Sequence, residues 1–374
     1  MPEHPDVLII GGGVIGLTTA YFLARDGVRV RIVERGDFGR EASWAGAGIL
    51  PPGQPVPDLH PYDLLRAHSA ALFPILTAEL RERTGIDNGY LRCGGLELGA
   101  PDPSLEAPWR REGIAFEAVA DAALQRLEPA LAESLWQAYY LPGMAQVRNP
   151  RHLKALQAGC ARLGVALQPG CGVQGFERQG SRVVAVRTDR GSLSAGRYLL
   201  AAGAWSEGLL QALGWQPGIR PVRGQIALLN TGAPLLRRIV MEGKCYLVPR
   251  PDGRILVGAT EEDAGFDKRT TVAGIEGLLA LARRLVPALA DAQLERCWAG
   301  FRPGSPDCMP FLGSVPGTDN LYVAAGHFRA GLQLSPATGL LLKELLLGQT
   351  LTMPLEAFRL DRGPTAPPGL AFRS

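Results

Sequence analysis

The sequence predicts an α/β (α+β) protein: a Rossmann-like domain joined to a second domain that is built on an antiparallel sheet. Residues 6–10 form an apolar run of strand length directly before a glycine-rich turn, and residues 197–202 and 320–325 form two similar runs that stop at a glycine. Continuous apolar strands are typical of a parallel sheet covered on both faces. The length of 374 residues exceeds the roughly 100–200 residues of one ordinary domain, which favours two domains.

A glycine-rich turn, GGGVIG at residues 11–16, follows the first of these strands. It fits the G-x-G-x-x-G fingerprint, in which the first glycine allows a tight turn, the second lets the backbone approach a pyrophosphate and the third lets helix and strand pack closely. The phosphates would lie at the N-terminus of the next helix, where free N–H groups and the helix dipole attract anions. The residues that we expect to bind a dinucleotide here are Gly11, Gly13, Val14, Ile15 and Gly16.

The elements after this turn support the same interpretation. Residues 17–26 read as a helix, and residues 28–34 read as a second strand that ends in Glu34. The Glu34 carboxylate would accept hydrogen bonds from ribose hydroxyls and would repel a 2′-phosphate, which disfavours NADP. We assign Arg35, the next residue, to the same site. A glycine-rich turn without a ligand is the alternative, but it leaves Glu34 unexplained.

Residues 35–50 favour a flavin over a nicotinamide nucleotide, because the further αβ units of a classical NAD domain do not follow Glu34. Instead, residues 42–48 (ASWAGAG) are mostly small, which leaves room for a bulky planar group and offers it backbone N–H groups. Such clusters also occur where elements pack closely, and an NAD-dependent dehydrogenase stays an alternative. The residues of this segment that we expect to contact a flavin are Ala42, Ser43, Ala47, Gly48 and Ile49.

Composition and charge exclude several classes of protein. Lys and Arg number 39 and Asp and Glu 36, so the formal charge is +3 and no nucleic-acid partner is expected. The six cysteines form no spaced pairs, which argues against a metal site or a disulfide framework and favours reduced, buried thiols. Residues 7–24 are uncharged over the length of a membrane helix, but four glycines interrupt them. No targeting segment is visible, so we expect a cytoplasmic protein without a membrane span.

Several further elements are expected along the chain. Residues 51–61 form a proline-rich connector and residues 62–83 a helix. Strands at residues 224–229 and 244–249 suggest an antiparallel sheet, which would be the floor of a substrate chamber. The residues after Asp361 form a loose tail. Short strands are expected at residues 165–168, 172–178 and 182–188.

The last helix has a clear start signal. Ser335 is a good N-cap and Pro336 suits the first helical position, so residues 337–347 are expected to be helical and to end at Gly348. This N-terminus would follow the turn at residues 326–331. The helix dipole could there stabilise negative charge on a reduced flavin.

Four motifs together resemble the D-amino-acid oxidase superfamily of flavoenzymes, and within it the members that oxidise glycine in the thiamine pathway. They are the fingerprint with Glu34, residues 42–48, residues 298–303 (WAGFRP) and residues 326–331 (GHFRAG), which span nearly the whole chain. The resemblance implies non-covalent FAD, oxygen as the electron acceptor and a homo-oligomer, which is a tetramer in related enzymes. The further cofactor-binding residues that it implies are Val173, Gly203, Gly326, His327, Phe328, Arg329, Ala330, Gly331, Leu332 and Gln333.

The resemblance also implies a reaction. Glycine, and also sarcosine and small D-amino acids, would be oxidised to an imine that hydrolyses to a 2-oxo acid and ammonia, while oxygen becomes hydrogen peroxide. Arg302 would hold the substrate carboxylate with a bidentate fork, Tyr246 would add a hydroxyl to it, and Arg329 would lie near substrate and flavin. A structural ion pair for Arg302 and core packing for Tyr246 are the alternatives. No histidine is given an acid–base role, and His327 is expected to act through its backbone.

Two residues depart from the pattern of related enzymes. Glu261 stands where some of them have an apolar pocket residue, so it would alter side-chain selectivity if it faces the substrate; alternatively it points to solvent. Cys308 lies where sarcosine-oxidising relatives carry a cysteine bonded to the flavin. Its surroundings, PDCMP at residues 306–310, look more like the non-covalent members.

The chain is expected to divide into two domains. Residues 1–90, 145–220 and 305–374 would form the FAD-binding domain, and residues 91–144 and 221–304 the substrate domain. Two other functions stay open at this point: a dehydrogenase that passes electrons to a quinone or another acceptor, and a flavin- or nucleotide-binding module without catalytic activity.

Overall fold

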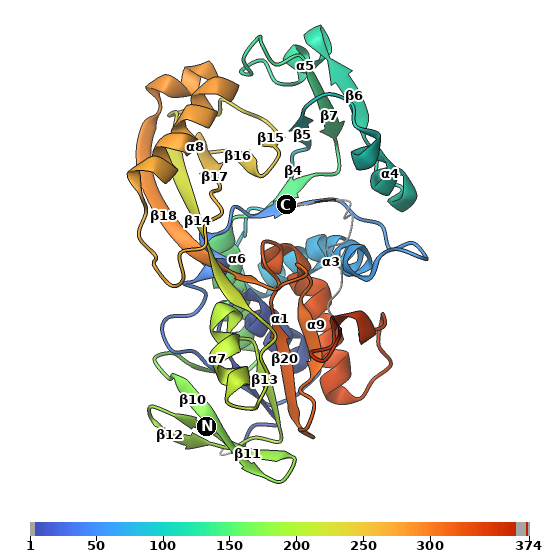
Figure 1. The fold of residues 1–374 in the computed structure, drawn as a ribbon, viewed down its shortest axis with the longest axis vertical. Helices are drawn as coiled ribbons and strands as arrows, with labels where there is room; N and C mark the ends of the chain where they lie inside the picture. The colour runs from blue at the N-terminus through green and yellow to red at the C-terminus, as the bar shows by residue number, and fades with distance from the viewer. Residues whose placement is uncertain (1–3, 364–371, 373–374) are drawn as a thin grey trace.

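A computed structural model describes residues 4–363 and residue 372, with two large sheets stacked along the long axis of the molecule (Figure 1). The lower, six-stranded sheet has the order β19-β20-β13-β1-β2-β9 and is parallel except for the edge strand β19. It confirms the predicted apolar strands and the parallel sheet. Its strands are β1 (Val7–Ile10), β2 (Val30–Val33), β9 (Ala166–Gln168), β13 (Arg197–Leu200), β19 (Phe311–Ser314) and β20 (Leu321–Ala325).

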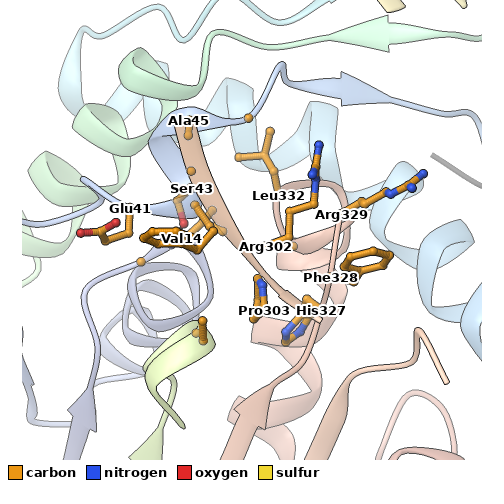
Figure 2. Close-up of a pocket in the computed structure, with 18 of the residues that line it drawn as sticks. Val14, Glu41, Ser43, Ala45, Arg302, Pro303, His327, Phe328, Arg329 and Leu332 are labelled. Carbon is orange, nitrogen blue, oxygen red and sulfur yellow. Dashed lines mark hydrogen bonds between the residues drawn. The ribbon is translucent and has the colours of Figure 1, made fainter. Parts of the chain in front are cut away.

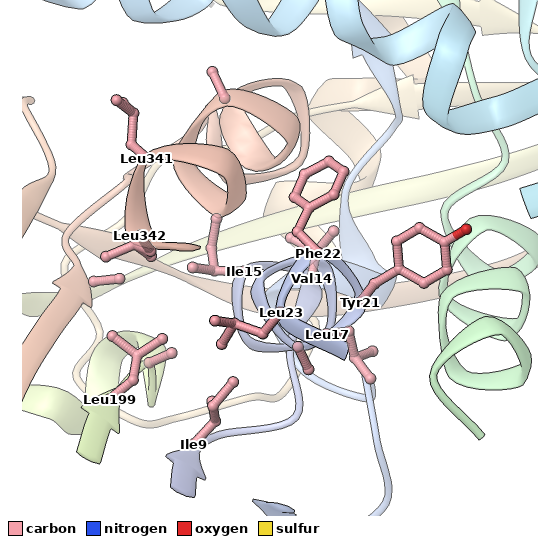
Figure 3. Close-up of a cluster of buried hydrophobic side chains, with 14 of the residues drawn as sticks. Ile9, Val14, Ile15, Leu17, Tyr21, Phe22, Leu23, Leu199, Leu341 and Leu342 are labelled. Atoms are coloured by element: carbon pink, nitrogen blue, oxygen red, sulfur yellow. The ribbon is translucent and has the colours of Figure 1, made fainter. Parts of the chain in front are cut away.

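Side-chain alternation along β1 explains why both faces of this sheet are buried. Val7 and Ile9 point to the face on which two long helices pack (Figure 3), and Leu8 and Ile10 point to the face that a small sheet covers. Successive side chains of a strand point to opposite faces, so a fully apolar strand fits a sheet that is covered on both sides. The covering elements are α1 (Val14–Arg25), α9 (Gly331–Leu347), β10 (Val173–Gln179), β11 (Arg182–Thr188) and β12 (Gly191–Leu193).

The upper, eight-stranded sheet has the order β18-β14-β17-β16-β15-β5-β7-β6. Its neighbours are antiparallel, as predicted, except for the parallel pair β5–β15. Helices α5 and α8 pack on one face, and the other face is turned toward a cavity. These elements are β5 (Gly95–Leu98), β6 (Glu117–Ala120), α5 (Asp121–Leu127), β7 (Gln137–Leu141), β14 (Arg220–Asn230), β15 (Ile239–Glu242), β16 (Cys245–Pro249), β17 (Arg254–Gly258), α8 (Val272–Leu285) and β18 (Gln293–Gly304).

The remaining elements connect and cover the two large sheets. Helix α3 matches the helix predicted at residues 62–83, and the proline-rich connector before it contains no helix or strand. Strands β3, β8 and β4 form a small sheet of their own. These elements are α2 (Ala42–Ala45), β3 (Ile49–Leu50), α3 (Pro61–Thr84), β4 (Leu91–Arg92), α4 (Pro103–Glu112), β8 (Ala145–Gln146), α6 (Asn149–Arg162), α7 (Ser206–Gln211), and short 3₁₀ helices at Gly203–Trp205, Pro287–Asp291 and Glu356–Phe358.

The first helix starts earlier than the sequence predicts. Helix α1 begins at Val14 and not at Leu17, because the carbonyl of Gly13 already accepts a hydrogen bond from the backbone N–H of Leu17 at 2.9 Å. The last residues of the glycine-rich fingerprint therefore form the first helical turn. Val14 and Ile15 of this turn line the cavity described below.

The start of the last helix was predicted wrongly. Helix α9 begins at Gly331, so Ser335 is not its N-cap and Pro336 lies inside it. Pro336 has no N–H to donate to the carbonyl of Leu332, and the hydroxyl of Ser335 donates to that carbonyl instead, at 2.8 Å. The Ser335–Pro336 pair resembles a helix start signal but lies inside the helix, where the serine hydroxyl donates the hydrogen bond that the proline cannot. The predicted end at Gly348 is confirmed, with φ of 66°.

Replacing Ser335 with alanine is expected to lower the free energy of unfolding by about 1–2 kcal/mol. The substitution removes the donor to the Leu332 carbonyl at a fully buried position. Denaturant unfolding measures the change, with Ser314→Ala at an exposed position of β19 as the control. Equal stabilities of the two variants would show that the hydroxyl does not compensate for the proline.

Three other expectations concern the chain as a whole. No helix within the described ranges is both long and apolar enough to cross a membrane. The predicted loose tail after Asp361 falls mostly outside the described residues. Each large sheet takes its strands from one of the two predicted sets of segments, apart from Arg220 at the start of β14. This supports the division into two domains, which stays a proposal.

Candidate active site

A cavity of about 1050 Å³ lies between the carboxyl ends of the parallel strands and the open face of the eight-stranded sheet. Ligands of open α/β sheets bind outside the carboxyl ends of the strands, and this volume is at the upper end of ordinary ligand sites. Figure 2 shows Val14, Glu41 and Ser43 toward one end and Arg302 and Arg329 toward the other. We call these the nucleotide end and the substrate end.

The glycine turn forms the wall of the nucleotide end. Gly11 has φ of 112°, and a Cβ there would lie 2.3 Å from the carbonyl oxygen of Ala201. A Cβ on Gly16 would lie 2.1 Å from the Gly11 carbonyl oxygen, so Gly16 serves packing and does not line the cavity. Gly13 does line it, and the hydroxyl of Ser43 accepts a hydrogen bond from the N–H of Val14 at 3.0 Å. The structure therefore brings the fingerprint and Ser43 together at a helix N-terminus.

Glu34 lies at the end of β2 and is held by two backbone groups. Its carboxylate accepts hydrogen bonds from the N–H of Gly12 at 2.8 Å and from the N–H of Gly36 at 3.0 Å. A carboxylate has further lone pairs, so these bonds fix its orientation and leave it able to accept from hydroxyls. Both Glu34 and the neighbouring Arg35 line the cavity.

Two residues of the loop after β17, Phe266 and Lys268, contact side chains at the nucleotide end. The sequence did not reveal these contacts. The Arg35 guanidinium lies over the ring of Trp205, 3.5 Å from its centroid, and Phe266 stacks on Trp205 at 5.0 Å. Glu41 pairs with Lys268 at 2.7 Å. Phe266 and Lys268 belong to the loop after β17, whereas their partners belong to the lower part of the molecule.

The small residues Ala42, Ser43, Ala47 and Gly48 of the ASWAGAG segment line the cavity, and so does Ile49, which follows the segment. Gly48 has φ of 77°, and a Cβ there would lie 2.1 Å from the carbonyl oxygen of Val147. Asn149, which was not predicted, donates from Nδ2 to the Ser43 carbonyl at 2.8 Å, while none of the described residues donates to its buried Oδ1. The predicted Val173 and Gly203 also line the cavity.

The turn at residues 326–331 brings the start of α9 to the cavity. The lining residues here are His327, Phe328, Arg329, Gly331, Leu332 and Gln333, whereas Gly326 and Ala330 lie behind the wall. The Nε2 amide of Gln333 is buried near the Tyr62 hydroxyl, and no described residue accepts a hydrogen bond from it within 3.5 Å. A buried donor without a partner is costly, so an acceptor on a ligand is expected there.

His327 cannot act as an acid at neutral pH. Its side chain is buried, and burial lowers its pKa to about 3. The ring lies 3.4 Å from the hydroxyl of Thr338. Burial therefore favours the neutral ring, and the absence of an acid–base role for His327 stays a prediction.

Arg302 and Tyr246 define the substrate end. Nη1 of Arg302 donates to the carbonyl oxygen of Thr260 at 2.9 Å, and the guanidinium lies so close to Gly224 that a Cβ there would be 2.4 Å from Nη1. Tyr246 fits against Gly258 in the same way, since a Cβ on Gly258 would be 2.6 Å from its hydroxyl oxygen. Burial lowers the pKa of Arg302 and raises that of Tyr246. No ion pair joins Arg302 to a carboxylate in the described part of the chain.

Glu261 lines the cavity and is also exposed to solvent, so it lies at the cavity's edge. It forms an ion pair with Arg329, and its Oε1 accepts from Nζ of Lys244 at 3.1 Å. All three residues line the cavity. Lys244, next to β16, was not predicted as a site residue.

Six cysteines are free within the described structure. Cys160 and Cys171 are buried as expected, but Cys93, Cys245, Cys297 and Cys308 are partly exposed, so the prediction of buried thiols is wrong for these four. Cys308 lines the cavity, and burial raises the pKa of its thiol. A raised thiol pKa disfavours the reactive thiolate at neutral pH.

Glu97, on β5, is another lining residue that was not predicted. It has no local sequence signal, because the pairing of β5 with β15 brings it beside Met241. Burial raises its pKa to about 7, against the opposing effect of a hydrogen bond from the backbone of Gly243. The carboxyl is therefore partly protonated at neutral pH.

This raised pKa makes stability depend on pH. In the unfolded chain Glu97 ionises near its ordinary pKa of 4.5, so the folded protein loses stability as the pH rises from about 4.5 to about 7. Glu97→Gln cannot ionise and is expected to be more stable than the wild type by on the order of 2 kcal/mol at pH 8, with a smaller difference at pH 5.5. Unfolding at both pH values tests this, with the exposed Glu117→Gln as control. A difference independent of pH would contradict it.

The comparisons with known proteins agree with this geometry. Residues 6–345 match the family model DAO, described as FAD dependent oxidoreductase, and the chain belongs to this family. Among its relatives, glycine oxidase of Pseudomonas aeruginosa is 40% identical over 365 residues, which cover 97% of this chain and 98% of the relative. The bifunctional protein ThiO/ThiG of Synechocystis sp. is 38% identical over 385 residues, which cover all of this chain and 56% of the relative.

A solved structure shows the same architecture. The crystal structure of glycine oxidase from Geobacillus kaustophilus superposes with a TM-score of 0.91 at 35% identity, covering 97% of this chain and 100% of that one. The fold and the family make this protein an FAD-dependent oxidoreductase.

The residues of the cavity fit FAD. The glycine turn and the N-terminus of α1 suit a pyrophosphate, the Glu34 carboxylate suits ribose hydroxyls, and the wall of small residues leaves room for a planar ring system. The Nε2 donor of Gln333 and the Oδ1 acceptor of Asn149 are buried and have no hydrogen bond to another described residue, so they suit polar atoms of a ligand.

Proposed function

We propose that this protein oxidises glycine, and also sarcosine and small D-amino acids, with oxygen as the electron acceptor. Glycine, oxygen and water would give glyoxylate, ammonia and hydrogen peroxide by way of the imine. The observation that carries the proposal is Arg302: a guanidinium in the cavity wall, held by the Thr260 carbonyl and free of any carboxylate partner within the described chain. A half-buried cation without a carboxylate partner favours an anionic ligand, and the substrate carboxylate supplies it.

The side chains at the substrate end have separate tasks in this reaction. The planar fork of Arg302 fixes the substrate carboxylate by two parallel hydrogen bonds, and the hydroxyl of Tyr246 adds a third from β16. FAD, when bound, accepts two electrons from the amine and returns them to oxygen. No general base is assigned, because a substrate whose amine is neutral can lose a hydride from Cα without prior removal of a proton.

Several parts of the proposal concern the cofactor and the setting. We propose that FAD is bound without a covalent link, that the residues named above hold it, and that Arg329 lies near its reactive part. The oxidised product would supply thiazole synthesis in thiamine biosynthesis, as the family resemblance and the ThiO/ThiG relative suggest. On the same resemblance we propose that the protein forms a homo-oligomer, which is a tetramer in related enzymes. We also propose that it is cytoplasmic.

An anaerobic substrate screen tests the function. Glycine is expected to bleach the flavin absorption, and admission of air is expected to restore it with one hydrogen peroxide per glycine. Bleaching without peroxide would indicate a dehydrogenase that uses a quinone or another acceptor. A bound flavin that no amine bleaches would indicate a non-catalytic module. Flavin absorption that stays with the acid-precipitated protein would contradict non-covalent binding and point to Cys308.

A further inference from the structure

Five side chains from the two parts of the molecule form a continuous series of contacts at the nucleotide end. The Arg35 guanidinium lies 3.5 Å from the ring centroid of Trp205, and its Nη2 lies 3.5 Å from Oε1 of Glu41. Phe266 stacks on Trp205, and Lys268 pairs with Glu41. The series therefore begins and ends on the loop after β17. We call Arg35, Glu41, Trp205, Phe266 and Lys268 the clasp.

The loop after β17, which carries the last two members of the clasp, is braced by the upper sheet. The buried Arg223 of β14 donates to the backbone carbonyl oxygens of Asp267 at 3.2 Å and Arg269 at 3.1 Å. Gln225 of the same strand accepts from the N–H of Thr271 at 2.8 Å. These bonds fix the loop on its own sheet, so the sheet holds its side chains against the lower part of the molecule.

The clasp lies beside the position that suits the adenosine half of FAD. Arg35, Glu41 and Trp205 line the cavity, whereas Phe266 and Lys268 do not. The side chains of Arg35 and Glu41 are 46% and 37% exposed, so they lie where the cavity meets solvent. Figure 2 shows Glu41 at this end. Arg35 directly follows Glu34, whose carboxylate suits the ribose hydroxyls of an adenosine.

We propose that the clasp is a further part of the FAD site, in which Phe266 and Lys268 are positioning residues. They hold Trp205, Arg35 and Glu41 at the rim of the cavity, beside the adenosine half. An aromatic stack, a cation–π contact and a partly exposed ion pair are each weak, but the rim opens only when they separate together. Retention of FAD therefore depends on the contact between the upper loop and the lower sheet, in addition to the glycine turn.

The experiment measures the release of FAD from the holoenzyme. The holoenzyme is diluted, and the flavin that stays with the protein is measured at intervals after gel filtration. We expect Phe266→Ala to release FAD about fivefold faster than the wild type, and Phe266→Ala combined with Lys268→Met about tenfold faster or more. Phe266→Tyr keeps the ring and Lys268→Arg keeps the charge, so each should release FAD at close to the wild-type rate.

Two matched controls separate the clasp from a general loss of contacts. Phe116 is also a partly buried phenylalanine, but its ring packs on Trp109 and Tyr139 and does not line the cavity. Arg269 is an exposed cation of the same loop as the clasp, and its side chain pairs with Asp267 within that loop. Phe116→Ala and Arg269→Ala are expected to release FAD at close to the wild-type rate.

The absorption spectrum of the bound flavin separates a local effect from a distortion of the whole site. The clasp lies beside the adenosine half, so the spectrum of the Phe266→Ala holoenzyme should match that of the wild type. An unchanged release rate in Phe266→Ala, an equal increase in Phe116→Ala, or an altered flavin spectrum would overturn the proposal. The inference goes beyond the proposed function and its test needs no turnover, so a failure to oxidise glycine would contradict the proposed function alone.

Discussion

Replacing Arg302 with alanine is expected to lower kcat/KM for glycine by roughly 100- to 4000-fold. The loss corresponds to about 3 to 5 kcal/mol, which is typical when one partner of a buried, hydrogen-bonded charge pair is removed. The substrate carboxylate would then lie in the cavity without its cation. Steady-state oxygen consumption with glycine measures the change.

Two further variants show whether the fork or the charge matters. Arg302→Lys keeps the charge but loses the planar pair of donors, and its activity should lie between those of the wild type and Arg302→Ala. Arg220→Ala is the control, because Arg220 begins the strand that pairs with β18 but forms an exposed ion pair with Asp263. A near-normal kcat/KM for glycine in Arg302→Ala would refute the assignment of the carboxylate site.

Replacing Gly11 with alanine is expected to abolish most FAD binding and to destabilise the fold. The new methyl group would lie 2.3 Å from the carbonyl oxygen of Ala201, and the φ of 112° is one that residues with a side chain rarely adopt. Backbone strain of this kind costs about 1–3 kcal/mol, and the clash with a rigid neighbouring strand adds to it. The turn must shift, and it can no longer present the start of α1 to the pyrophosphate.

The measurement is the ratio of flavin to protein absorbance, together with the melting temperature of the purified chain. Gly36→Ala is the matched control, since nothing lies within 4 Å of a Cβ at Gly36. Full flavin occupancy in Gly11→Ala would show that the turn tolerates a side chain. Our account of the fingerprint would then be wrong.

The parts of the molecule that could be predicted depend on contiguous residues. The fingerprint, Glu34 and the small residues 42–48 are each read from one short segment, and the structure places most of them around one cavity. The start of α9 was missed because a Ser-Pro pair has the same appearance at a helix start and inside a helix, where the serine hydroxyl takes over the bond that proline cannot make.

The residues that were missed depend on partners that are distant in the chain. Glu41 and Lys268 are 227 positions apart, and Trp205 meets Phe266 through a loop of the other large sheet. Glu97 reaches the cavity through the parallel pairing of β5 with β15, which no local pattern specifies. Tertiary arrangement decides such contacts, so residue types alone could not reveal them.

The order of strands in the lower sheet has a consequence for synthesis of the protein. Strand β13 ends at Leu200, but β20, its neighbour in the sheet, starts at Leu321, and α9 covers α1 only after that. At ~5–20 residues per second, the ribosome needs roughly 6–24 s to make the intervening residues. During that time the nascent chain carries an unpaired edge of a parallel sheet and an uncovered apolar helix, which are hazards for aggregation. Chaperones that bind the nascent chain during this interval would therefore shield the unpaired edge of β13 and the apolar face of α1.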